Sequence, residues 1–265
     1  MLRTVSASLS LRVAAPATSA LQIAVADGTH RRREQLTVTA NGVEIEPKEL
    51  PAPHGGRMHH LTLPAGDVEI EYRAIVHGED TRQRIHEHDL MTYLRPSRYA
   101  ESDALFGLAR KEFSGHSGLE LANAVRDWVA AHLSYRPGST RGTDSARDAL
   151  GRGRGVCRDF AHLTVAFLRA MDVPARVTAA YAPGLSPMDF HAVAEAFVDD
   201  QWHVLDATGL AHRGTLLRIT TGRDTSDTAF LSSYGAAVNL TRMTVEAKVD
   251  TELPEDDHTA PVVMR

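Results

Sequence analysis

The sequence predicts an α+β protein in which a small β-sandwich-like domain precedes a core of helices packed on an antiparallel sheet. Residues 1–90 consist mostly of short segments with strand character, separated by turn residues. From about residue 96 to 172 the apolar positions recur every three to four residues, as in amphipathic helices. After Pro174 the period returns to two. Because the helices come first and the strands follow as a group, the core is expected to be α+β rather than alternating α/β.

These changes in the spacing of apolar residues, together with the composition of the last residues, divide the chain into three parts. We expect a β-rich domain at residues 1–90, a core at 91–250 and an acidic, mobile tail at 251–265. Asn41-Gly42 is a turn signal between two strands of the first domain. The last strand of that domain alternates apolar and charged side chains, which is typical of a strand with one solvated face. The expected strands are 21–27, 35–42 and 68–76.

The core begins with four predicted helices. Ser102 is a candidate cap for a helix that ends near Phe113, because its hydroxyl oxygen can accept a first-turn N–H. Residues 119–135 place apolar side chains at helical spacing, and Ser145 is a candidate cap for a short third helix. The fourth helix is expected to begin at Cys157 and to end before the next proline, which cannot continue a helix.

Strands follow the fourth helix. The segment Asp199-Asp200-Gln201 has the composition of a tight turn, so the two strands beside it are expected to pair antiparallel. The expected strands are 175–183, 190–198, 202–208 and 244–249.

Composition narrows the class of function. The chain has 265 residues and a net charge of −5 with His neutral, which gives no electrostatic case for nucleic acid or an anionic membrane as partner. No segment approaches the roughly 18 apolar residues of a membrane span. Polar residues interrupt residues 1–26, so no continuous apolar stretch of a signal peptide is present. We therefore expect a cytoplasmic protein.

Cys157 is the single cysteine of the chain, and it stands where the fourth helix should begin. First-turn N–H groups have no intrahelical partners, and the helix dipole places partial positive charge there. Both effects favour a thiolate, which is the nucleophilic form of cysteine. Gly153 and Gly155 allow a tight backbone path that would expose the sulfur. The alternative is a buried thiol that acts as a small apolar side chain.

A thiolate nucleophile needs a base, and His191 is the candidate among the 14 histidines. It stands at the start of one strand of the predicted hairpin, and Asp206 stands near the end of the other. Antiparallel pairing would bring the two side chains close together. Cys157, His191 and Asp206 would then form the nucleophile, base and orienter of an acyl-transfer triad. Taken singly, His191 could instead be a half-buried sheet histidine and Asp206 a carboxylate that caps the following turn.

Three sequence blocks resemble the transglutaminase-like superfamily, in its bacterial cysteine-protease-like branch. The first is the G-x-G-x-C-R-D-x-A helix start together with the V-P-A-R-V that follows the helix. The second is the His block with an acidic residue four positions on, Glu195, and the third is W-x-x-L-D-x-T. The loop TGRDTSD and the β-rich first 90 residues are also similar to features of that branch. The specific matches lie within residues 153–227.

The resemblance implies a papain/transglutaminase-like core that performs thiol-dependent acyl transfer on peptide or isopeptide amides. Cys157 matches the family nucleophile, His191 the general base and acid, and Asp206 the residue that orients the imidazole. Hydrolysis, as by a cysteine protease or amidase, is the expected outcome. The alternatives are transglutaminase-type transfer to an amine, or a non-catalytic binding or scaffold module with a vestigial triad. Val193 and Ala207 replace the Trp and Pro usual in the family.

An acyl-transfer intermediate also needs hydrogen-bond donors for its oxyanion. The backbone N–H of Cys157 is the first candidate donor. Tyr135 is the second, and its alternative role is that of a core aromatic. Arg158 is a candidate to support the thiolate electrostatically or to form a surface ion pair, and Asp159 is expected to serve the helix N-terminus.

Two histidine-containing segments, HEHD (His86, His88, Asp89) and His59-His60, raise the question of a metal. In HEHD both histidines would lie on one side of a strand, but no third and fourth ligand follows at a recognisable spacing. We therefore expect polar surface at these positions, no metal and no cofactor. The expected partner is a peptide or protein substrate, and the sequence leaves the oligomeric state open.

Overall fold

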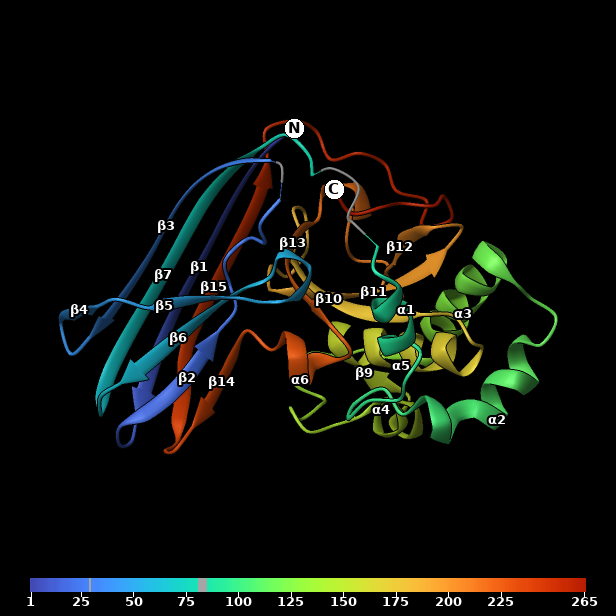
Figure 1. Cartoon of the computed structure of the whole chain (residues 1–265), viewed down its shortest axis with the longest axis horizontal. Helices are drawn as coiled ribbons and strands as arrows, with labels where there is room; N and C mark the ends of the chain where they lie inside the picture. Colours follow the sequence, from blue (N-terminus) through green and yellow to red (C-terminus); the bar gives the residue numbers. More distant parts are fainter. Residues whose placement is uncertain (29, 81–84) are drawn as a thin grey trace.

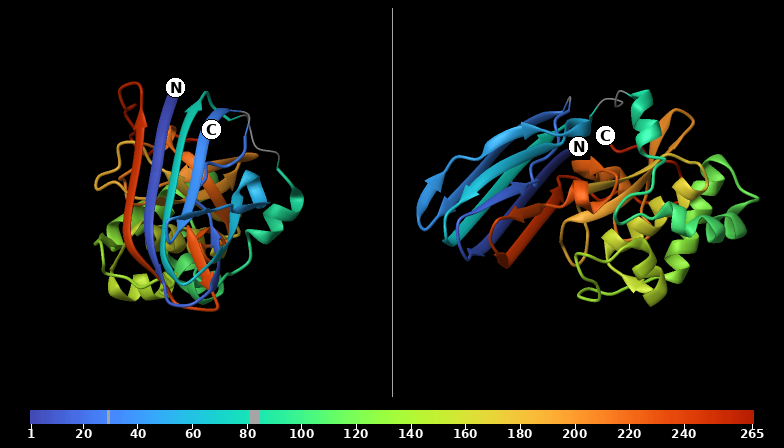
Figure 2. Two further views of the ribbon diagram at one scale, coloured as in Figure 1. Left: turned by 90° about the vertical axis from the view of Figure 1, so that its left-hand side faces the viewer. Right: turned by 60° about the horizontal axis from the view of Figure 1, so that its bottom comes forward.

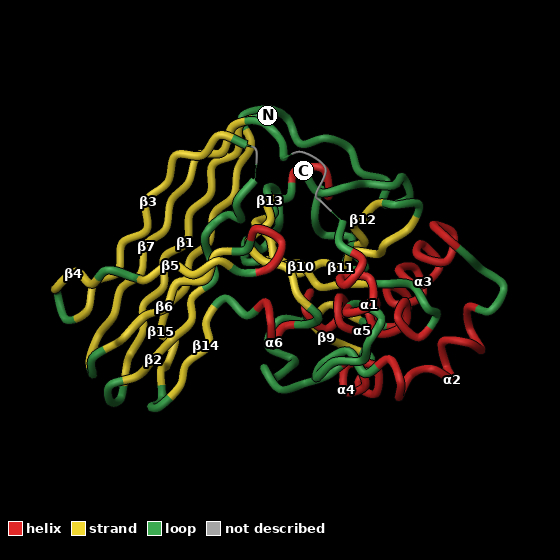
Figure 3. Tube along the Cα trace, in the orientation of Figure 1, coloured by secondary structure: helices red, strands yellow, loops and turns green. Residues whose placement is uncertain are grey.

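A computed structural model describes residues 1–28, 30–80 and 85–265 of the chain. A β-sandwich lies beside an α+β core, and the strands of the core lie between the sandwich and the core helices (Figure 1). The helices formed by residues 102–132 lie at the end of the molecule remote from the sandwich, whereas the short helix at 225–228 lies beside the sandwich (Figure 3). The arrangement confirms the predicted α+β class.

The sandwich consists of two antiparallel sheets that share one apolar core. Its strands are β1 (Leu2–Val13), β2 (Ala17–Leu21), β3 (Arg31–Ala40), β4 (Val43–Ile45), β5 (Lys48–Pro51), β6 (Arg57–Leu63), β7 (Gly66–His77), β14 (Leu231–Tyr234) and β15 (Val238–Val249), with a 3-10 turn, η1, at Pro53–Gly55. One sheet has the order β15-β1-β7-β3-β4 and the other the order β14-β2-β6-β5. Side chains buried from both sheets remove apolar surface from water, which is the main stabilising term for such a pair of layers.

Two of the three strands predicted in the first domain are confirmed, and the third is largely wrong. In β7, buried and exposed residues alternate along the strand, as the alternation of apolar and charged residues indicates. The segment 21–27 is strand only at Leu21 and then leaves the sheet. It is nevertheless buried, and its backbone N–H groups find partners outside a regular ladder. These are Gln22 to the Phe230 carbonyl, Val25 to the Tyr72 hydroxyl and Ala26 to the Arg218 carbonyl.

Six helices occur in the described part of the core, together with a 3-10 turn. They are α1 (Glu87–Thr92), α2 (Ser102–Phe113), α3 (Gly118–His132), α4 (Ala146–Arg152), α5 (Cys157–Ala170), α6 (Thr225–Thr228) and η2 (Arg213–Thr215). Ser145 caps α4 through a reciprocal capping box with Asp148, as predicted. Ser102 does not cap α2, because the helix begins one residue earlier than expected: Glu101 is the cap residue and Ser102 is the first, buried helical residue.

The helix α5 is the centre of the core. Every residue from Asp159 to Ala170 is buried, so neighbours surround the helix instead of covering the single apolar stripe that its sequence suggests. The helices α2, α3 and α4 pack against it, and the core sheet covers another side. Only its first turn, with Cys157, remains partly exposed.

The core sheet is antiparallel and contains the predicted hairpin. Its strands are β10 (Ala175–Tyr181), β11 (His191–Val198), β12 (Gln201–Leu205) and β13 (Leu217–Gly222), in the order β12-β11-β10-β13. Asp199 and Asp200 connect β11 to β12 with φ angles of 48° and 58°. Two consecutive residues with positive φ are typical of the type I′ turn, whose twist matches that of the flanking strands.

The C-terminal strands complete the sandwich rather than the core. β15 pairs along its length with β1, and β14 pairs with β2. Residues 231–249 therefore differ from their predicted place in a core that ends at residue 250. The two views in Figure 2 show the strand near the C-terminus at one edge of the sandwich. The pattern of apolar and polar residues could not show which sheet these strands join, because a strand that pairs with β1 has the same two-residue period as one that pairs with β13.

The tail 251–265 also differs from its prediction. It was expected to be mobile, but it crosses the core and makes buried contacts. Met264 is 6% exposed, and the Asp256 carboxylate forms an ion pair with Arg213. No helix among the described residues is long and apolar enough to cross a membrane.

Candidate active site

Cys157 lies at the first residue of α5, as predicted. The preceding Val156 is extended, and its N–H donates to the Asp159 carboxylate at 2.8 Å. Asp159 thus closes the first turn of the helix, the place that the sequence assigned to it. Gly155 is required here, because a Cβ at this position would lie 2.6 Å from the Cβ of Asp159.

His191 and Asp206 meet across the β11–β12 hairpin. The strand register pairs Ala194 with Leu205, so its continuation puts Asp206 opposite Val193. His191 lies two residues from Val193 and is therefore the diagonal neighbour of Asp206. His191 Nε2 lies 2.9 Å from Asp206 Oδ2, and the two residues are each 2% exposed. The Asp206 carboxylate also accepts hydrogen bonds from Thr208 and Ala211.

Cys157 lines the same cleft as His191, and its sulfur interacts with the imidazole. Nδ1 of His191 has no hydrogen-bond partner among the described residues, while Nε2 is taken by Asp206. Burial by itself lowers the pKa of His191, but the Asp206 carboxylate and, next, the Cys157 sulfur raise that pKa to about 10. Burial raises the pKa of Asp206, but the His191 imidazole lowers it to about 2. The structure therefore brings the three predicted residues together in the order sulfur, imidazole, carboxylate.

Tyr135 reaches the same place from a two-residue strand. The strand β8 (Ser134–Tyr135) pairs in parallel with β9 (Arg154–Gly155), just before Cys157. The Tyr135 phenol lies beside the Cys157 backbone N–H. Burial and the neighbouring Cys157 sulfur raise the pKa of Tyr135 to about 12, and the Cys157 N–H opposes that rise. At neutral pH the phenol therefore carries its proton and can donate it.

Arg158 lines the same cleft as Cys157. Its guanidinium donates to the Thr140 hydroxyl and the Arg141 carbonyl, both at 2.9 Å, and lies 3.7 Å from the Asp159 carboxylate. These contacts favour the ion-paired role among the two that the sequence left open for Arg158.

Glu195, the acidic residue of the His block, is not part of the site. It is fully buried in β11 and binds Arg176 and Arg218 at 2.8 Å. Burial raises the pKa of Glu195, but the two guanidinium groups lower it well below its ordinary range. Glu195 therefore stabilises the interior of the core sheet.

A cleft of about 610 Å³ opens at Cys157 and His191. One wall comes from α5 and β11. The other comes from the sandwich and from the segment that leads into β14, with Phe230, Leu231 and Met243. Sequence reasoning missed these residues, because an apolar residue in an edge strand has the same pattern as one in a sandwich core.

The histidine-rich segments do not gather ligands in the described parts of the chain. His86 and His88 stack with ring centroids 5.5 Å apart, and His88 lies 3.1 Å from Asp89. No group of three or more His, Cys, Asp or Glu side chains among residues 1–28, 30–80 and 85–265 is placed to hold a metal ion.

Comparison with known proteins assigns the chain to a family. A solved structure from Cytophaga hutchinsonii, described as that of a candidate cysteine protease, is 32% identical and superposes with a TM-score of 0.86. The match covers 97% of this chain and 94% of that one. The chain belongs to the transglutaminase-like superfamily. The sequence profile of this superfamily matches residues 109–207, which include Cys157, His191 and Asp206.

A more distant relative of this transglutaminase-like protein is the uncharacterised protein ML0607 of Mycobacterium leprae. It is 27% identical over 169 residues, and the match spans 59% of each chain. The chain thus covers less than two thirds of that relative's length.

Proposed function

We propose that the chain is a cysteine hydrolase that cleaves peptide or isopeptide amides through Cys157, His191 and Asp206. The observation that carries this proposal is the placement of a buried His191, with Asp206 on Nε2 and with the sulfur of Cys157, the first residue of α5, interacting with the imidazole. That order of groups is the one an activated thiol needs. The description of the Cytophaga relative as a candidate cysteine protease favours hydrolysis over transfer to an amine.

The chemistry follows from the positions of the protons. The thiolate sulfur of Cys157 attacks the amide carbonyl carbon, and the carbonyl π electrons move to the oxygen. The imidazolium of His191 gives its Nδ1 proton to the leaving nitrogen as the C–N bond breaks, which leaves a thioester. Nδ1 then takes a proton from water, whose oxygen attacks the thioester and releases the acid and the thiolate. Throughout, Asp206 holds the Nε2–H and stabilises the imidazolium.

The oxyanion of each tetrahedral intermediate needs donors beside the sulfur. The backbone N–H of Cys157 and the hydroxyl of Tyr135 lie together at the start of α5, and we assign them this role. Preorganised donors of this kind stabilise charge that exists only in the intermediate and transition state, so they increase kcat.

Cys157 is the only thiol of the chain, so its alkylation tests the proposal directly. We expect iodoacetamide to modify wild type rapidly at pH 6, where ordinary thiols are protonated and slow. His191→Ala should slow the reaction by at least about tenfold, because the imidazolium that stabilises the thiolate is lost. His60→Ala, at an exposed position in β6, is the control and should leave the rate unchanged.

Turnover should be measured beside alkylation. A peptide and isopeptide library, with and without a primary amine, should show cleavage in wild type that is lost in Cys157→Ala. Incorporation of the amine into the peptide without release of a cleaved product would show that the activity is transamidation and not hydrolysis. Slow alkylation that His191→Ala does not change would indicate a vestigial triad in a binding module, and would overturn the proposal.

A further inference from the structure

We propose that Arg213 and Asp256 are positioning residues, through which the segment 251–265 holds Asp206 in place. This inference rests on the role of Asp206 in the proposed function. We call residues 251–265 the C-terminal strap. Among the described residues no hydrogen bond or ion pair joins the strap to Cys157 or His191, so the strap acts on the site through the segment 207–213.

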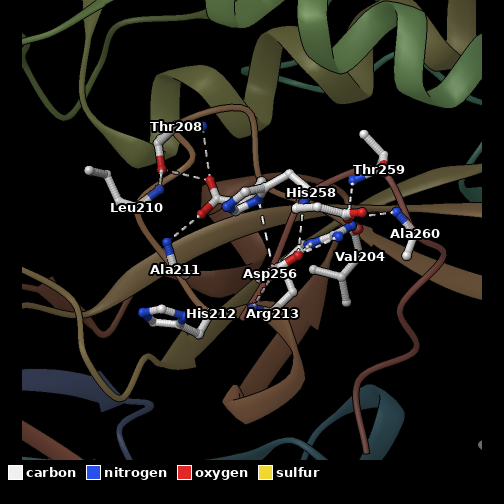
Figure 4. Close-up of polar contacts among 12 residues, drawn as sticks. Val204, Thr208, Leu210, Ala211, His212, Arg213, Asp256, His258, Thr259 and Ala260 are labelled. Carbon is white, nitrogen blue, oxygen red and sulfur yellow. Dashed lines mark hydrogen bonds and ion pairs between the residues drawn. The ribbon is translucent and has the colours of Figure 1, made fainter. Parts of the chain in front are cut away.

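Asp206 depends on that segment for most of its hydrogen bonds. The Thr208 backbone N–H and hydroxyl donate to Oδ1 at 2.9 and 2.7 Å. The Ala211 N–H donates to Oδ2 at 3.0 Å, on the same oxygen that faces His191. Thr208 and Ala211, which Figure 4 labels, therefore set the orientation of the carboxylate that orients the His191 imidazole.

Arg213 connects this segment to the strap. Its guanidinium binds both Asp256 oxygens, with Nε at 2.9 Å from Oδ2 and Nη2 at 2.7 Å from Oδ1. The Arg213 backbone N–H donates to Asp256 Oδ2 at 2.8 Å as well. The side chains are only 1% and 8% exposed. A buried bidentate pair of this kind has a single geometry, so it fixes the backbone of residue 213 relative to the strap.

The strap also binds β12, the strand that leads to Asp206. β12 is an edge of the core sheet, and Val204 turns its free backbone groups outward. The Val204 N–H donates to the Val262 carbonyl at 2.8 Å, and the Val204 carbonyl accepts from Arg213 Nη1 at 3.2 Å. Both the N–H and the carbonyl of Val204, two positions before Asp206, are thus hydrogen-bonded, the first to the strap and the second to Arg213.

The strap has its own internal order around Asp256. The His258 N–H donates to Asp256 Oδ1 at 2.9 Å, and the His258 ring lies 4.0 Å from Oδ2. Asp257 accepts the N–H groups of Thr259 and Ala260, which forms a turn (Figure 4). These bonds keep the Asp256 carboxylate aimed at Arg213.

Loss of the Asp256 charge would leave the Arg213 guanidinium buried without a counter-ion. A buried unpaired charge is strongly unfavourable, so Arg213 and the segment 207–213 would have to shift toward water. Residues 208–211 would move with it, and Asp206 would lose its alignment with Nε2. Misplacement of a supporting group by about 1 Å can reduce a rate by about 10²-fold.

The test uses the full chain and the alkylation of Cys157, which needs no known substrate. We compare the iodoacetamide rate constant at pH 6 with that at pH 9 in wild type, Asp206→Asn, Asp256→Asn and Asp256→Glu. When Asp206 is displaced, the pKa of His191 falls, so the imidazolium is lost and the rate at pH 6 drops relative to that at pH 9. The ratio should fall by about tenfold in Asp256→Asn, in the same direction as in Asp206→Asn. Asp256→Glu, which keeps the charge, should restore part of it.

Glu255→Gln is the matched control, because Glu255 is the adjacent, exposed carboxylate of the strap. Its ratio should equal that of wild type. Thermal melting checks that each variant is folded at the assay temperature. If Asp256→Asn does not fold, Arg213→Lys replaces it, since lysine keeps the charge but cannot bind Asp256 and Val204 together.

The outcomes separate this inference from the proposed function. A ratio that falls in Asp206→Asn but stays at the wild-type value in Asp256→Asn and Arg213→Lys overturns the positioning role alone. A ratio that falls in neither overturns the triad, and the positioning role with it. A lower melting temperature with an unchanged ratio would show that the strap stabilises the fold without orienting Asp206.

Discussion

Tyr135 reaches the Cys157 backbone from a strand of two residues that directly follows α3. The sequence predicts that Tyr135 is an oxyanion donor or a core aromatic, and its ring does pack near Phe160 while its hydroxyl interacts with the Cys157 backbone N–H. The aromatic packing is therefore observed, and the oxyanion role stays a proposal. The parallel pairing of Tyr135 with Gly155 holds the phenol beside the start of α5.

Tyr135→Phe removes only the hydroxyl and keeps the ring. We expect kcat to fall by about 10²-fold with little change in KM, because the lost donor acts on an oxyanion that forms after binding. Steady-state kinetics on a cleaved peptide measures this. A rise of similar size in KM with constant kcat would instead show that the hydroxyl contributes to ground-state binding. The melting temperature should stay close to that of wild type, because the aromatic packing is kept.

At the scale of the element, the start of α5 depends on the absence of a side chain at residue 155. The Asp159 carboxylate bends back to the Val156 N–H, and a Cβ on Gly155 would overlap it. The G-x-G before Cys157 therefore serves two purposes. Gly153 adopts a positive φ of 61° at the end of α4, and Gly155 makes room for the cap of the next helix.

Gly155→Ala is expected to displace the Asp159 cap and to destabilise the protein by about 1–3 kcal/mol, as other overpacked positions do. Activity should fall as well, because Cys157 begins at that turn. Gly151→Ala is the matched control. Gly151 lies within α4 with no atom within 4 Å of an added Cβ, so alanine should stabilise the helix by about 0.5–1 kcal/mol. Urea unfolding measures both, and equal effects of the two changes would contradict this account.

The β11–β12 hairpin was predictable in detail, whereas the segment 21–27 was not. Asp199 and Asp200 form a turn whose geometry depends on those two residues alone, so local chemistry determines it. The segment after Leu21 is apolar and resembles a strand, but it lies where the sandwich meets the core. There its N–H groups bond to carbonyls and a hydroxyl far along the chain, and that contact overrides its local preference.

At the scale of the whole molecule, a buried charge cluster holds the core sheet. Arg176 on β10, Glu195 on β11 and Arg218 on β13 join three of its four strands. The family pattern placed an acidic residue four positions after the histidine, and the structure shows it as a link between strands instead of a group at the site.

Glu195→Gln keeps the size of the side chain and removes its charge. We expect a loss of about 3–5 kcal/mol in the free energy of unfolding at pH 7, because the buried guanidinium groups lose their counter-ion. The folded pKa of Glu195 lies below its ordinary 4.5, so its carboxylate stabilises wild type above that pH and less as the pH falls. The difference between variant and wild type should therefore shrink in acid.

Urea unfolding between pH 7 and pH 3 measures that difference. Glu255→Gln, at an exposed position, should leave stability within about 0.5 kcal/mol of wild type. A Glu195→Gln protein as stable as wild type at pH 7 would show that the cluster contributes no net stability.

The cytoplasmic location and the peptide or protein substrate stay predictions from composition and family.

Local sequence patterns were enough to predict the α+β class, the helix start at Cys157, the Ser145 cap and the hairpin that carries His191 and Asp206. Each depends on periodicity, capping or a turn, which act between residues a few positions apart. The three blocks of family resemblance added the roles proposed for Cys157, His191 and Asp206. The return of residues 231–249 to the sandwich, where Leu231 and Met243 line the cleft, depends on long-range strand pairing that the sequence pattern does not show. The tertiary structure alone also placed the acidic tail against the core, because the carboxylate of Asp256 finds its buried partner Arg213 43 positions away in the chain.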